Sequence, residues 1–135
     1  MYAAKQLVKK LIAAEKNVLK SKVLIMGATF KENVTDIRNS KVVDMVKELE
    51  SYGVSVDVVD PYASSMDYKH EYGFGLVENP RNDYDAVVVA VMHTDYLSLT
   101  EEDIEKYMIN VSNPIVVDLK GILKNKINRL SYWSF

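Results

Sequence analysis

Two cations, Lys31 and Arg38, belong to the stretch GATFKENVTDIRNS, residues 27 to 40, which precedes a helical sequence pattern. The first turn of a helix has backbone N–H groups without partners, and cations beside such a turn suit a phosphate or diphosphate group. Spacing alone leaves a second interpretation open. In that interpretation Lys31 is a solvated loop lysine, and Arg38 pairs with Asp36 two residues earlier.

The same stretch lacks the G-x-G-x-x-G pattern of a dinucleotide-binding loop. Gly27 is followed by Ala28 and Thr29, and no second or third glycine lets a pyrophosphate approach the backbone. Asp60 follows Gly27 by 33 positions, beyond the spacing of about 20 expected of a ribose-binding acid. We interpret Asp60 and Pro61 as a turn, and we expect no tightly bound nicotinamide dinucleotide on this domain alone.

The side chains that could ligate a metal or act as nucleophiles are few. The chain has no cysteine, which removes disulfides, thiolate ligands and a cysteine nucleophile. Its two histidines, His70 and His93, are far apart in the sequence. His93 follows an apolar strand, but no second histidine or positioned acid accompanies it, so we expect a structural or hydrogen-bonding role. We therefore expect neither a catalytic residue nor a metal site.

Short runs rich in Val and Ile predict strands that are buried on both faces. Residues 40 to 53 predict a helix with Ser40 as N-cap and Gly53 as C-terminal stop, and residues 101 to 109 predict another helix. The segment from 61 to 83 mixes turn formers with isolated aromatics, which indicates a short helix and an irregular loop. The predicted strands are KVLIMG, VSVDVVDP, DYDAVVVAVM and NPIVVDLKG.

The N-terminal segment, residues 2 to 20, predicts an amphipathic helix. Together with the strands it indicates an α/β fold: a three-layer αβα domain of Rossmann type with a mainly parallel sheet, and a candidate domain boundary near Ser21. Ligands of such sheets bind outside the carboxyl ends of the strands, near the point where strand order reverses. The apolar residues of the predicted helix are Leu7, Val8, Leu11, Ile12, Val18 and Leu19.

Length and composition limit the class of function. A chain of 135 residues has room for one ordinary core. The formal net charge of −2 gives no overall basic balance of the kind that nucleic-acid-binding domains have. No apolar run approaches the roughly 20 residues that a membrane span needs. We expect neither a nucleic-acid nor a membrane partner, and a cytoplasmic location.

One string in residues 27 to 40 resembles the signature that opens the C-terminal domain of the UDP-glucose/GDP-mannose dehydrogenase family. VDVVDP, DAVVVAVMHTDY and VVDLKG resemble later family segments in the same order, so the resemblance runs from about Lys22 to about Leu123. The string is G-x-x-F-K-x-x-x-x-D-x-R-x-S, formed by Gly27, Phe30, Lys31, Asp36, Arg38 and Ser40.

Members of that family oxidise the C6 hydroxyl of a nucleotide sugar to a carboxylate in two NAD-linked steps, through a thioester on a cysteine. The resemblance implies that residues 21 to 135 are a UDP-sugar-binding C-terminal domain. Residues 1 to 20 would be the tail of a central dimerisation region; a helix packed on its own sheet is the open alternative. Without a cysteine or glycine fingerprint, we expect this chain alone to be inactive. NAD would be bound mainly by an N-terminal domain of the same dehydrogenase chain, in a homo-oligomer.

By the same resemblance, Phe30 and Lys31 contact the nucleotide sugar, and Arg38 reaches toward NAD across the domain cleft. The family usually has an arginine where this chain has Lys120, which keeps the charge but loses the planar fork. This form resembles members that oxidise UDP-N-acetylhexosamines for bacterial surface polysaccharides more than members that act on UDP-glucose.

Two other functions remain in view. One is a stand-alone Rossmann-like nucleotide-binding or interaction module without catalysis. The other is a phosphoacceptor receiver, which needs clustered carboxylates at the ends of its first and third strands, where this chain has GAT and MHT. The missing carboxylates disfavour the receiver.

Overall fold

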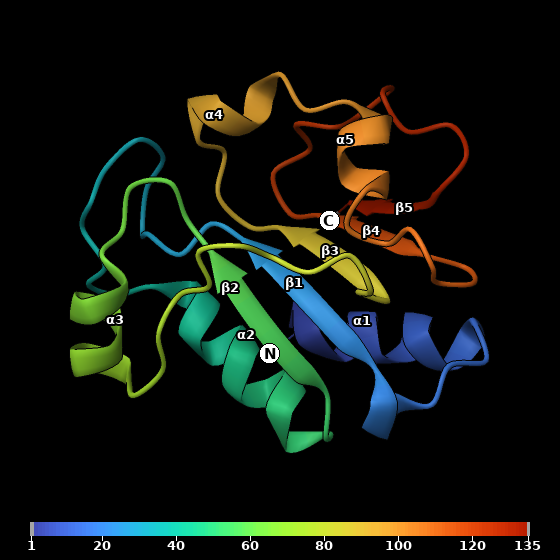
Figure 1. Ribbon diagram of the computed structural model, residues 1–135, viewed down its shortest axis with the longest axis horizontal. Coiled ribbons are helices and arrows are strands. Elements are labelled where there is room, and N and C mark those ends of the chain that lie inside the picture. Colours follow the sequence, from blue (N-terminus) through green and yellow to red (C-terminus); the bar gives the residue numbers. More distant parts are fainter. Residues whose placement is uncertain (1, 135) are drawn as a thin grey trace.

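A five-stranded, all-parallel sheet forms the centre of the protein (Figure 1). The computed structural model describes residues 2–134. The strand order β2-β1-β3-β4-β5 confirms the parallel sheet, and β5 is a strand that the sequence patterns did not predict. The strands are β1 (Lys22–Met26), β2 (Ser55–Val59), β3 (Ala86–Val89), β4 (Ile115–Asp118) and β5 (Ser131–Ser134).

Helices cover both faces of this sheet. In Figure 1, α1 and α2 lie below the sheet, α4 and α5 lie above it, and α3 lies beyond the edge strand β2. The predicted three-layer fold is therefore confirmed. The helices are α1 (Tyr2–Ala13), the 3-10 turn η1 (Val18–Lys20), α2 (Lys41–Ser51), α3 (Ser65–Tyr72), α4 (Thr94–Leu97) and α5 (Glu101–Glu105).

Alternating side chains of the central strands fill two separate cores. Val23 and Ile25 of β1 pack with α1 and α2, whereas Leu24 and Met26 pack with the layer that contains α5. All four are buried, and burying one such side chain contributes about 1.5–3 kcal/mol. Burial on both faces explains why these strands have continuous apolar runs rather than alternating ones.

The helix α1 packs on its own sheet, which was the alternative left open by the sequence. Its buried residues join the same core as Val23 and Ile25. The helix ends at Ala13, earlier than predicted, because Glu15 takes a left-handed conformation (φ 60°) and a separate turn follows. Leu19, counted in the predicted apolar face, is 74% exposed.

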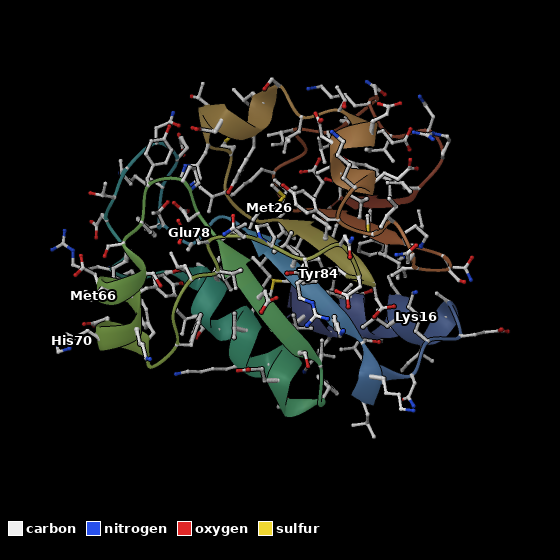
Figure 2. The ribbon with its side chains drawn as sticks, viewed as in Figure 1. Lys16, Met26, Met66, His70, Glu78 and Tyr84 are labelled. Atoms are coloured by element: carbon white, nitrogen blue, oxygen red, sulfur yellow. The ribbon has the colours of Figure 1, made fainter. Side chains whose placement is uncertain are left out.

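A half-buried ion pair connects the segment after α1 to the amino edge of the sheet. The Lys16 ammonium lies 3.0 Å from Oδ1 of Asp85, whose Oδ2 accepts a hydrogen bond from the backbone of Lys22 at 2.9 Å. Figure 2 shows Lys16 at the end of the molecule away from α3. A second contact joins α1 to the last strand: the Lys10 ammonium lies 4.2 Å from the centre of the Trp133 ring in β5.

The C-terminal boundary of another predicted helix also differs from the structure. The helix predicted for residues 101–109 ends at Glu105, and the short α4 precedes it. Ser40 is the N-cap residue of α2, as predicted, but its hydroxyl donates to the Ala28 carbonyl at 2.8 Å and makes no hydrogen bond to the helix. Gly53 follows α2 with φ 90°, as predicted.

Within residues 2–134, no helix has the length and apolar character needed to cross a membrane.

Candidate functional site

The sheet has its topological switch point between β1 and β3. The chain leaves β1 toward β2 on one side and later returns to β3 on the other side, so the two loops that follow β1 and β3 diverge there. Sheets with the order 2-1-3-4-5 bind ligands in the crevice at this point. In Figure 1 the carboxyl ends of β1, β2 and β3 all point toward residues 27–40, drawn in blue to teal. The predicted binding loop therefore lies at the expected edge.

A small hollow of about 80 Å³ lies at this switch point. It brings Phe30, from the loop after β1, together with Lys120, from the loop after β4. It also includes Lys41, the first residue of α2, which the sequence analysis did not single out. Its place directly after the family string could have identified it as a third cation near a helix N-terminus. The other lining residues are Thr29, Glu32, Val42, Ala90, Val91 and Met92.

A second hollow of about 410 Å³ shares Phe30 with the first. Lys31 and Arg38 both line it, so two of the predicted site residues lie together here. Phe30 is 48% exposed, which leaves part of its ring open to a ligand. The four predicted site residues thus lie around two adjoining hollows at one edge of the sheet.

Arg38 is paired with Asp36 in the structure. Its guanidinium makes two hydrogen bonds to the carboxylate, from Nε to Oδ1 at 3.0 Å and from Nη2 to Oδ2 at 2.9 Å. These contacts lower the pKa of Asp36 to about 2. The Arg38 side chain is nevertheless 82% exposed, so an anionic ligand could compete with Asp36 for it.

A buried histidine and aspartate lie beneath residues 27–40. Nε2 of His93 is 2.8 Å from Oδ2 of Asp60, and both side chains are 0% exposed. The structural and hydrogen-bonding role predicted for His93 is confirmed, but the expectation that no acid accompanies it was wrong. Neither side chain is accessible from the surface of this domain.

The far end of the loop is held by aromatic residues of α3. The Tyr68 hydroxyl lies 3.0 Å from the hydroxyl of Ser40, and Tyr72 donates to the carbonyl of Ile37. Burial raises the pKa of Tyr68 to about 12, so this hydroxyl keeps its proton at neutral pH. The loop is therefore anchored where it enters α2, as well as near β1.

The turn that bears Lys120 is organised by a buried carboxylate. Asp118, at the end of β4, accepts hydrogen bonds from the backbone N–H groups of Gly121, Ile122 and Leu123 at 2.7–3.2 Å. It also accepts from the Tyr132 hydroxyl at 2.6 Å. A carboxylate with this many donors is well compensated for its burial. The Lys120 backbone is thereby held close to the end of β4.

The described part of the chain has no group of three or more histidine, aspartate or glutamate side chains placed to hold a metal ion. The fold and the edge just described define a class: a Rossmann-like α/β domain with cationic residues around its switch point, which suits an anionic ligand. Residues 24–125 match the model of the UDP-glucose/GDP-mannose dehydrogenase family, UDP binding domain. The chain belongs to this family.

Relatives place the chain within this family. It is 42% identical over 123 residues to UDP-N-acetyl-D-glucosamine 6-dehydrogenase of Pseudomonas aeruginosa, a match that covers 90% of this chain and 29% of the relative. The enzyme of the same name from Salmonella typhi is 40% identical over 123 residues, covering 90% of this chain and 28% of that relative. The chain therefore spans less than a third of the length of these two relatives.

A solved structure supports the fold independently. NDP-N-acetyl-D-galactosaminuronic acid dehydrogenase from Methanosarcina mazei Go1 superposes with a TM-score of 0.80 at 25% identity, over 99% of this chain and 27% of that chain. UDP-D-ManNAc dehydrogenase from Pyrococcus horikoshii has the same TM-score at 23% identity, over 98% of this chain and 29% of that one. The second likeness shows the fold alone.

Proposed function

We propose that this domain binds the nucleotide part of a UDP-N-acetylhexosamine and serves an NAD-dependent UDP-sugar 6-dehydrogenase. The observation that carries the proposal is the gathering of Phe30, Lys41 and Lys120 around one hollow at the switch point. These residues come from three separate segments, and the hollow lies where this strand order places its ligands. The names of the two bacterial relatives support an N-acetylhexosamine as the sugar.

The side chains suggest how the ligand is held. Lys31, Lys41 and Lys120 supply compact positive charges for the diphosphate and for sugar oxygens. The N-terminus of α2, which begins at Lys41, adds backbone N–H groups. Phe30 offers an exposed ring against which a base or sugar can pack.

The oxidation itself needs groups that this chain lacks. It has neither a cysteine for a thioester nor the glycine fingerprint of a dinucleotide site. We assign both to other parts of the dehydrogenase, with which this domain would act in an oligomer that makes sugars for surface polysaccharides. Arg38, at the exposed rim, would contact NAD held by the dinucleotide-binding part, exchanging Asp36 for the cofactor.

Titration calorimetry tests the proposal on the chain as it is. UDP-N-acetylglucosamine should bind at submillimolar to millimolar concentration, and uridine should bind at least about tenfold more weakly because it lacks the charged diphosphate. Circular dichroism under the same conditions verifies that the protein is folded. A folded protein that gives no heat with UDP-N-acetylglucosamine at millimolar concentration would contradict the proposal. Equal affinity for uridine would show that the diphosphate does not contribute to binding.

A further inference from the structure

The buried pair of Asp60 and His93 contacts residues 27–40 on both sides of Phe30 and Lys31. Asp60 Oδ2 accepts a hydrogen bond from the backbone of Ala28 at 2.6 Å, just before these residues. His93 Nδ1 accepts one from the backbone of Asn33 at 2.9 Å, just after them. The pair therefore fixes both ends of the short segment that carries two of the proposed ligand contacts.

The partners of His93 define which form of the ring the structure contains. Since Nδ1 accepts from the Asn33 N–H, the proton of the neutral ring is on Nε2, and Nε2 donates to Asp60. Asp60 Oδ1 also accepts from the backbone of Tyr62 at 2.7 Å and of Ala63 at 2.9 Å, which fixes the carboxylate itself. A second proton on the ring would occupy Nδ1 and face the Asn33 N–H, so this bond would be lost.

We propose that Asp60 and His93 are positioning residues that hold Phe30 and Lys31 in the ligand-binding arrangement, and that protonation of His93 releases them. The inference rests on the proposed function for its effect on ligand affinity. The hydrogen bond between the His93 ring and the Asn33 backbone does not depend on that function. The expected consequence is weaker binding of UDP-sugar in acid.

Three ionisable side chains lie against the His93 ring: those of Asp60, Tyr62 and Tyr96. Asp60 is the carboxylate in direct contact with the ring, and both side chains are fully buried. The rings of Tyr62 and Tyr96 lie with centroids 4.8 and 5.5 Å from that of His93. Both hydroxyls keep their protons because their pKa values are raised, that of Tyr62 chiefly by its hydrogen bond to Asp95 and that of Tyr96 by burial.

Protonation of His93 should release the segment that carries Phe30 and Lys31 only in part. The Asn33 side chain remains tied to α4, because its Oδ1 accepts a hydrogen bond from the backbone of Thr94 at 2.8 Å. The Thr29 hydroxyl, 3.4 Å from His93 Nε2, donates to the Lys31 carbonyl at 2.6 Å and needs no change. Losing the partly buried hydrogen bond between Asn33 and His93 corresponds to an affinity change of about tenfold.

The first experiment follows the wild-type chain by NMR without ligand, from about pH 8 to about pH 5, where histidines commonly titrate. The Asn33 amide signal should move in step with the ring signals of His93. His70 is the matched control, because it lies exposed on α3, where Figure 2 shows it pointing away from the sheet. His70→Gln should leave the movement of the Asn33 signal unchanged.

The second experiment measures the affinity for UDP-N-acetylglucosamine over the same range. Its diphosphate is a diester without the second phosphate ionisation near pH 6 that would complicate UDP. Wild type should bind about tenfold more weakly at those pH values where the ring signals show a second proton on His93. His93→Asn places an amide oxygen where Nδ1 accepts, so it should keep binding and lose the pH dependence. His93→Gln places its amide near Nε2 and lacks that acceptor, so it should bind weakly throughout.

The results distinguish the positioning role of Asp60 and His93 from the proposed binding of UDP-sugar. An Asn33 signal that stays still while the His93 ring gains a proton would overturn the positioning role, even if the variants fail to fold. Wild-type pH dependence in a folded His93→Asn protein would overturn it as well. If UDP-N-acetylglucosamine binds at no pH, the proposed function fails, and the Asn33 signal still decides whether the pair holds the loop.

Discussion

Gly27 and Val91 lie so close together that a Cβ atom on Gly27 would be 2.7 Å from Cβ of Val91 and 2.8 Å from its backbone nitrogen. Gly27 directly follows β1 and Val91 is the second residue after β3, so they lie on either side of the switch point. Gly27 also has a φ of 108°, a conformation that side chains disfavour. The start of the proposed binding loop therefore requires glycine for two separate reasons.

Gly27→Ala should destabilise the protein by about 1–3 kcal/mol, measured by urea unfolding. Gly73→Ala is the matched control, because Gly73 also has a positive φ (87°) but no atom lies within 4 Å of a Cβ placed there. The difference between the two variants isolates the contact with Val91. Equal losses would mean that backbone conformation alone accounts for the effect.

Lys31→Ala, Lys41→Ala and Lys120→Ala should each weaken binding of UDP-N-acetylglucosamine by about threefold to thirtyfold, since each removes a cation that we propose contacts the diphosphate. Lys124→Ala, at an exposed position beyond the hollow, should leave affinity unchanged. Titrations at low and high salt provide a second measure, because the contribution of exposed charges is screened. If all three site variants bind like wild type, these lysines do not form the site.

Arg38→Ala should raise the pKa of Asp36 from about 2 toward its usual value, because the hydrogen bonds from Arg38 lower it. A carboxyl-carbon NMR titration measures this directly. The melting temperature at neutral pH should stay within error, since exposed ion pairs contribute little to stability. An unchanged Asp36 pKa would show that the pair does not persist in solution.

Glu101 should make stability depend on acid pH. Its carboxylate accepts hydrogen bonds from the backbones of Leu130, Arg129 and Asn128 at 2.7–3.0 Å, which lower its pKa from the usual value near 4.5 to about 2. A lowered pKa means that its stabilisation is present above about pH 4.5 and is lost as the pH falls toward 2.

Glu101→Gln removes this titration. The variant should be less stable than wild type at neutral pH, and the difference should shrink as the pH falls from about 4.5 to about 2, in thermal unfolding followed by circular dichroism. Glu71→Gln, on the exposed surface of α3, serves as the control. A wild-type pH profile in Glu101→Gln would show that the hydrogen bonds to the 128–130 backbone do not stabilise the fold.

The three strands that are buried on both faces and the edge strand β2 could be predicted from the sequence, and the other edge strand, β5, could not. β1, β3 and β4 are runs of Val and Ile because both their faces are packed. β5 has two exposed serines around the half-buried Tyr132 and Trp133, so its short pattern differs little from a loop. The helix α4 has four residues and offers no periodicity to detect.

The site residues also differ in how far they could be predicted from the sequence. Phe30, Lys31 and Arg38 share one local string, whereas Lys120 was added through the family resemblance. The contact between Asp60 and His93 joins positions 33 apart, and no local pattern encodes it. The rule that parallel strands end at one edge could have suggested it, because these residues follow β2 and β3 closely. Its hydrogen bonds to residues 27–40 depend on side-chain geometry that only the structure gives.

The central claim is that UDP-sugar binds at the carboxyl edge, around the switch point. Backbone amide NMR signals of the chain, recorded during titration with UDP-N-acetylglucosamine, test it most directly. We predict that the largest shifts occur at Phe30, Lys31, Lys41 and Lys120, with little change at Lys16 and Asp85 on the amino edge. Binding that shifts the amino edge instead, or a folded protein that shows no shifts at millimolar ligand, would contradict it.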